Sequence, residues 1–238
     1  DLLSNLIPNN DEIFDFVEIS KLDFDFVQRK ILNLISKSDS GIVGVNIFAE
    51  NHEAFAIIIQ SYLESMCRSQ RSKGHSFVLY LSNVNSSSEF LFFQNLINQA
   101  KSKLCPNLNL KLGISITNSR GVVNYDRLTN ICSNILIDLD SISENFYGFS
   151  KRNSLIPEKL NKLEIWDKNY QKEFNNDDLG IFISQFVKNR DHVKLGLKND
   201  RSYKKSFKKW FLTQNYDYLV VDNKWLLNSI VNLSSDEA

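Results

Sequence analysis

Residues 134–153, NILIDLDSISENFYGFSKRN, decide the fold class of this chain. They open with the apolar run Ile135-Leu136-Ile137, which is typical of a short buried strand. The acidic, small-residue segment 138–141 follows, and we expect it to form a turn at the carboxyl end of that strand. In α/β folds these strand ends face the ligand crevice. The side chains of this segment are therefore the first candidates for chemistry.

Similar short apolar runs recur along the chain and alternate with segments of helical periodicity. They predict strands at 41–45, 77–81, Leu110–Ile116, 192–197 and 216–221. Helical spacing of apolar residues predicts helices over 55–66, 124–132, 181–187 and 202–213, and the run 86–89, SSSE, reads as a capping box that starts another. The alternation predicts parallel strands joined by right-handed crossovers, and hence an α/β fold.

Composition excludes some classes of function. The 238 residues suit one large α/β domain or two small ones. Lys+Arg and Asp+Glu both number 28, so no net field favours nucleic acid or an anionic membrane. No apolar run approaches the roughly 20 residues of a membrane helix, and no signal-peptide pattern opens the chain. We therefore expect a cytoplasmic protein.

The three cysteines, Cys67, Cys105 and Cys132, have no CxxC spacing and are odd in number. Reduced thiols are the favoured interpretation, with a reactive thiol as the alternative. The three histidines are isolated in the sequence and show no metal-ligand spacing.

The stretch 134–153 resembles a family signature. Its strand, loop and Gly148-Phe149-Ser150-Lys151 are similar, without a gap, to "FFSIGTNDLTQ…GFSRD" in the C-terminal barrel of phosphoenolpyruvate synthase and pyruvate phosphate dikinase. The resemblance covers roughly residues 41–233 and implies a parallel (β/α)8-type TIM barrel that binds phosphoenolpyruvate or pyruvate. Either residues 1–40, predicted as a weak strand and a helix packing on the barrel, supply a shortened beginning, or the barrel is incomplete. Residues 234–238 are expected to form a frayed tail.

The resemblance also implies where a site would lie. In the family, arginines bind the phosphoryl group and the carboxylate, Glu and Asp hold magnesium, and a cysteine protonates the enolate. Different residue types stand at the matching positions here: Val43 and Asn85 for the arginines, Thr117 for the glutamate, Asp140-Ser141 for Asn-Asp, and Lys198 for the cysteine. We therefore expect these six residues to line a vestigial pocket with no catalytic residue and no cofactor.

Three carboxylates near this position keep an alternative open. Asp138, Asp140 and Glu144 are weak magnesium candidates, because Mg²⁺ prefers oxygen ligands, and Lys198 could bind a small anion. The favoured interpretation is that these side chains solvate and shape a loop, so that no metal is bound.

Three functions follow from these patterns. The leading one is a non-catalytic homologue, or pseudoenzyme, that binds a protein partner or associates with itself as a scaffold. The alternative is an active phosphotransferase that interconverts pyruvate and phosphoenolpyruvate with magnesium. The third, a nucleic-acid or anionic-surface binder, would use the basic residues Arg201, Lys204, Lys205, Lys208 and Lys209. A solvated outer helix face is the better interpretation of those residues.

Overall fold

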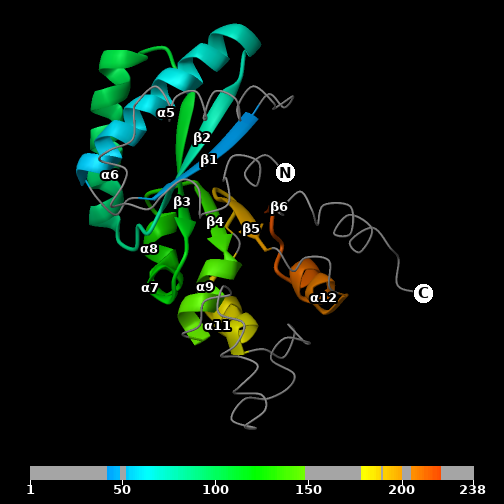
Figure 1. Ribbon diagram of the computed structural model, residues 1–238. Coiled ribbons are helices and arrows are strands. Elements are labelled where there is room, and N and C mark those ends of the chain that lie inside the picture. Colours follow the sequence, from blue (N-terminus) through cyan, green and yellow to red (C-terminus); the bar gives the residue numbers. More distant parts are fainter. Residues whose placement is uncertain (1–41, 49–51, 148–177, 189, 200–204, 221–238) are drawn as a thin grey trace, which may run out of the picture. The chain divides into compact units, whose positions relative to one another are not determined.

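The computed structural model describes residues 42–48, 52–147, 178–188, 190–199 and 205–220 (Figure 1). The chain divides into two compact units, Asp1–Ser115 and Ile116–Ala238. The predicted N-terminal segment 1–40 and the tail 234–238 lie outside the described residues, and the extent of a single barrel domain over 41–233 stays a prediction.

Three parallel strands are described in the first unit. Strand β1 (Ile42–Phe48) pairs with β2 (Ser76–Ser82), and β2 pairs with β3 (Leu110–Ile116). Two long helices connect them, α5 (His52–Lys73) and α6 (Ser87–Leu104), and they pack together along these strands (Figure 1). Parallel neighbours need such crossovers, because a tight turn can only reverse the chain.

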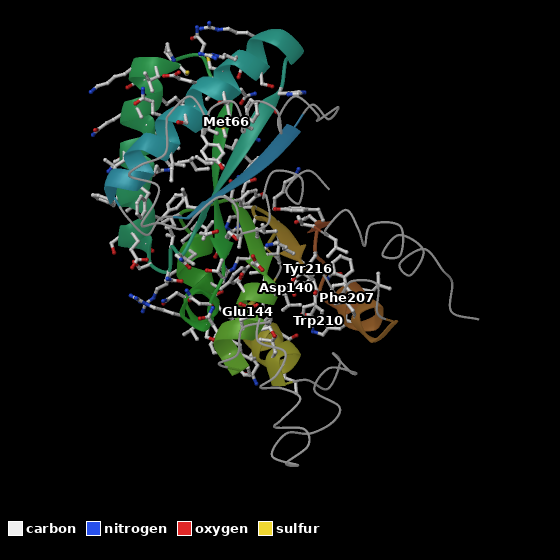
Figure 2. All side chains as sticks on the ribbon, in the orientation of Figure 1. Met66, Asp140, Glu144, Phe207, Trp210 and Tyr216 are labelled. Carbon is white, nitrogen blue, oxygen red and sulfur yellow. The ribbon has the colours of Figure 1, made fainter. Side chains whose placement is uncertain are left out.

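The apolar faces predicted for α5 and α6 form the core of this unit. Leu79 and Leu81 on β2 are fully buried, as is Met66 on α5 (Figure 2). The other buried members come from both helices: Ile58, Ile59, Tyr62 and Leu63 on α5, and Phe90, Phe93 and Ile97 on α6. The apolar face of α5, which includes Tyr62 and Met66, is therefore core, as its 3.6-residue period predicts.

Helix α6 begins at the predicted capping box. The Ser86 hydroxyl accepts a hydrogen bond from the Glu89 amide at 3.3 Å. The Glu89 carboxylate in turn accepts from the Asn85 amide at 2.7 Å, one residue before the position that the motif usually serves. Two amides near the start of the helix are thus satisfied by residues close in the sequence.

In the second unit, too, the described residues form three parallel strands. Strand β4 (Asn134–Asp138) pairs with β5 (Lys194–Lys198), which pairs with β6 (Tyr218–Val220). Five helices are described here: α7 (Ser119–Val123), α8 (Tyr125–Thr129), α9 (Leu139–Tyr147), α11 (Asp178–Phe186) and α12 (Lys205–Thr213). Every residue of β4 is buried, which explains the uninterrupted apolar run in the sequence.

Within each unit, consecutive strands among the described residues pair with one another in parallel. A TIM-type (β/α) barrel has this sequential parallel winding, and so does each half of a doubly wound sheet. The predicted α/β class and its parallel strands are confirmed. Closure of an eight-stranded ring would involve residues outside the described ranges.

Two local predictions were wrong. Residues 138–141 do not form a turn, because α9 begins at Leu139 directly after β4 and the Asp138 side chain accepts from the Ser141 amide at 3.1 Å. The helix predicted over 124–132 is shorter and follows α7, which starts where the Asn118 side chain accepts from the Gly121 amide at 3.0 Å. In both places an Asp or Asn that resembles a turn residue acts as a helix cap.

None of the helices in the part of the chain described here is long and apolar enough to cross a membrane.

Candidate site at the strand ends

The central feature of the site is a pair of opposite charges at the carboxyl ends of β4 and β5. Asp138 and Lys198 are the last residues of these strands, and the parallel register places them opposite each other. The Lys198 ammonium lies 2.9 Å from Oδ2 of Asp138. Their side chains are only 18% and 4% exposed, so the pair is largely withdrawn from water.

The surroundings of Asp138 keep this carboxyl ionised. Burial by itself would raise its pKa, but the Lys198 ammonium and the Ser141 amide outweigh burial and hold the pKa of Asp138 below its ordinary value. The amide bonds Oδ1 and the ammonium bonds Oδ2, so both carboxylate oxygens have partners. The carboxylate also lies at the amino end of α9, where the helix dipole favours negative charge.

A second set of contacts joins α9 to the segment after β3. The Asn145 side-chain amide donates to the Thr117 carbonyl at 3.2 Å and to the Ser141 carbonyl at 2.9 Å. Thr117 itself is buried. Thr117 and Ser141 are therefore linked through Asn145, a residue that the sequence did not single out, because an exposed helical Asn carries no motif.

The three candidate magnesium ligands differ in their surroundings. Asp138 is bonded to Lys198 and Ser141, whereas Asp140 and Glu144 lie one helical turn apart on α9 and are partly exposed (Figure 2). Among the residues that the structure describes, no three His, Cys, Asp or Glu side chains gather as a metal site would require. The three carboxylates are thus not brought together into one cluster.

The remaining predicted pocket residues belong to the first unit. Asn85 follows β2, and its side-chain amide donates to the Asn83 carbonyl at 3.0 Å, so it helps to shape the entry to α6. Val43 lies in β1 opposite Phe77, and its side chain lies outside the described residues. The side chains of the basic residues in 201–209 also lie outside the described residues. For Lys205, Lys208 and Lys209 the structure describes the backbone in α12.

The Asp138 carboxylate stabilises the protein through two contacts. The ion pair connects the end of β5 to the end of β4, and the same carboxylate caps α9. A buried carboxylate that lost its cation would be costly, so each partner depends on the other. The groups nearest to the expected crevice are therefore engaged with one another.

Comparison with known proteins adds little to this description. No family model and no curated protein matches the chain. Among solved structures, the chain is similar to the crystal structure of a citrate lyase from Burkholderia xenovorans LB400, with a TM-score of 0.49 and 7% sequence identity. The match covers 88% of this chain and 64% of that protein, so the chain spans less than two thirds of its length.

Proposed function

We propose that this chain is a non-catalytic relative of the phosphoenolpyruvate/pyruvate-binding barrels and serves as a protein-binding or self-associating scaffold. The observation that carries the proposal is the 2.9 Å ion pair between Lys198 and Asp138. At the strand ends, where a barrel enzyme presents ligating groups to its substrate, this chain uses a cation and a carboxylate to hold its own elements together.

The residue types at the other expected positions support the same proposal. Magnesium chemistry on a three-carbon acid needs carboxylate ligands, and a phosphoryl group needs fixed cations. Thr117 and Ser141 stand at the expected metal-ligand positions and offer neutral hydroxyls instead. Val43 and Asn85 carry no charge that would bind a phosphoryl oxygen.

Calorimetric titration tests the loss of the site. The full chain is titrated with magnesium chloride and phosphoenolpyruvate together, and separately with magnesium chloride and pyruvate. We expect no saturable heat in either titration. Saturable binding at micromolar concentrations would contradict the proposal, and turnover of ATP and pyruvate by the full chain would establish the phosphotransferase alternative.

Two lysines on one strand provide a matched control for any signal. Lys198 is in the ion pair, whereas Lys194 at the other end of β5 is exposed. Binding that disappears in Lys198→Met but persists in Lys194→Met would place an anion site at the strand ends. Equal losses in the two variants would indicate a general electrostatic effect.

The scaffold half of the proposal has its own measurement. Sedimentation equilibrium of the full chain at several concentrations reports self-association directly. A mass that rises with concentration supports a self-associating module. A monomer throughout would leave binding to a different protein as the form of the proposal to test by pull-down with purified candidates.

A further inference from the structure

One face of α5 contacts the segment that follows α6. Leu63, Cys67 and Gln70 are four and three residues apart, so they lie on the same side of the helix. The Leu63 carbonyl accepts from the Cys105 thiol, with a sulfur–oxygen distance of 3.4 Å. One and a half to two turns further along, the Gln70 side chain donates to the Asn107 carbonyl at 3.0 Å and accepts from the Asn109 amide at 2.6 Å.

Cys67 lies between these two anchor points and therefore faces the same segment. Cys105 is the residue that caps the carboxyl end of α6, and its amide donates to the Lys101 carbonyl at 2.8 Å. Its thiol is buried, whereas Cys67 is half-buried. Burial, and next the neighbouring Cys67, raises the pKa of Cys105 to about 12. In an α-helix the Leu63 carbonyl faces the amide of Cys67, so the contact of the Cys105 thiol with that carbonyl places the Cys105 sulfur beside Cys67. A small side-chain rotation would then bring the two sulfurs to bonding distance.

We propose that Cys67 and Cys105 are a peroxide-sensitive thiol pair that closes to an intramolecular disulfide between α5 and the end of α6. This inference concerns the first unit and is independent of the proposed scaffold function. It assigns a modification site, with hydrogen peroxide as the oxidant.

Exposure assigns a role to each thiol. Cys67 meets peroxide first, because it is the more accessible of the two and Cys105 stays protonated at neutral pH. Its sulfur takes one oxygen as the O–O bond breaks, giving a sulfenic acid and one water molecule. The Cys105 sulfur then displaces the hydroxyl group, which leaves with the thiol proton as a second water molecule. The sulfurs together lose two electrons, and the peroxide gains them.

The third cysteine serves as the internal control. Cys132 belongs to the second unit, is buried, and its thiol contacts the Asn134 carbonyl at 3.3 Å. The contacts that join α5 to residues 105–109 do not involve it. We expect its thiol to remain reduced while the pair closes.

The experiment treats the reduced full chain with a small excess of hydrogen peroxide at neutral pH. Free thiols are counted with a chromogenic disulfide, and tryptic peptides are mapped by mass spectrometry without reduction. Two of the three thiols should disappear, and the peptides of Cys67 and Cys105 should be joined with the loss of two hydrogens. The melting temperature should rise by about 5–10 °C and return on reduction with dithiothreitol.

Single-residue variants separate the pair from other reactions. Cys67→Ser should keep both of its thiols after treatment. Cys105→Ser should keep only the Cys132 thiol, with Cys67 carrying added oxygen and no linked peptides, whereas Cys132→Ser should still form the linked peptides. The peptide map of the unsubstituted chain gives the answer even where a variant fails to fold. A covalent dimer through Cys67, a linkage to Cys132, or three thiols remaining after treatment would each overturn the proposal.

Discussion

The carboxyl end of β2 in the first unit and the carboxyl end of β4 in the second each lead into a helix, and the two helix starts are stabilised by different contacts. After β2, Asn83 adopts a positive φ of 61°, Asn85 bonds back to it, and Ser86 and Glu89 satisfy amides at the start of α6. All of these contacts join residues at most four apart. After β4, one carboxylate caps α9 locally and also binds a lysine sixty residues away.

The difference shows how much stability rests on one group. At the end of β2 several modest hydrogen bonds divide the task, and each is worth on the order of 1 kcal/mol. At the end of β4 a single buried charge depends on one distant partner, so the loss of that partner leaves the charge uncompensated. The end of β4, with its buried ion pair, should therefore be far more sensitive to substitution than the end of β2.

The largest effect is expected for Lys198→Met. This variant keeps most of the length of the side chain but removes the cation from Asp138, and we expect it to lose about 3 kcal/mol of unfolding free energy. Urea denaturation followed by circular dichroism measures the loss. The double variant Lys198→Met/Asp138→Leu should recover much of it, because both charges are then absent. If Lys198→Met lowered the unfolding free energy by no more than Ser86→Ala, the removal of a helix cap at the end of β2, the two strand ends would not differ as expected.

Acidification tests the same pair with the sign fixed in advance. The folded pKa of Asp138 lies below its ordinary value of 3.8, so its contribution to stability is present above that value and is lost as pH falls through the lower folded pKa. In Lys198→Met burial no longer has an opposing cation. The folded pKa then rises, and the contribution of Asp138 to stability should grow as pH falls. Urea midpoints measured from pH 6 down to about pH 3 would show opposite slopes for this contribution in the two proteins, and equal slopes would contradict the assignment.

A close contact between β5 and β6 should give the next effect. Gly196 pairs with Tyr218, and a Cβ on Gly196 would overlap the Tyr218 ring. We expect Gly196→Ala to cost about 1–3 kcal/mol, because the ring must move away. In the Tyr218→Ala background the same substitution should cost much less, and an unchanged cost in that background would rule out the ring as the cause.

Substitutions at the end of β2 should lower the unfolding free energy by less. Ser86→Ala removes the hydroxyl that caps α6 and should cost about 1 kcal/mol. Ser102→Ala is the matched control, since Ser102 is exposed in the same helix and alanine is the better helix former there. The urea midpoint of Ser86→Ala should be lower than that of Ser102→Ala. Equal midpoints would show that the Ser86 cap is not used.

The smallest effect is expected for an exposed ion pair. Arg190 and Asp126 lie 2.6 Å apart, but their side chains are 36% and 67% exposed. Water screens such a pair, so Asp126→Asn should change the unfolding free energy by about 0.2–1 kcal/mol. A cost that matches Lys198→Met would show that burial does not separate the two ion pairs.

The same contrast explains what the sequence could predict. The apolar runs predicted all six described strands, because a buried parallel strand needs an uninterrupted apolar surface. The capping box at Ser86 and Glu89 was predicted because its partners are close in the sequence. The Asp138–Lys198 pair was not predicted, because the register that brings the two residues together is set by strand pairing and not by their spacing. The sequence predicted a turn at Asp138 instead of a helix cap. Its hydrogen bond from the Ser141 amide depends on where α9 begins, which the sequence does not show.

The strand order within each unit also bears on how the chain acquires its structure. The described strands pair with their sequence neighbours, so each can dock on the previous strand once it and the intervening helix have been made. We therefore expect β1, α5 and β2 to assemble before the later half of the polypeptide has been synthesised, so that synthesis and folding advance in the same direction.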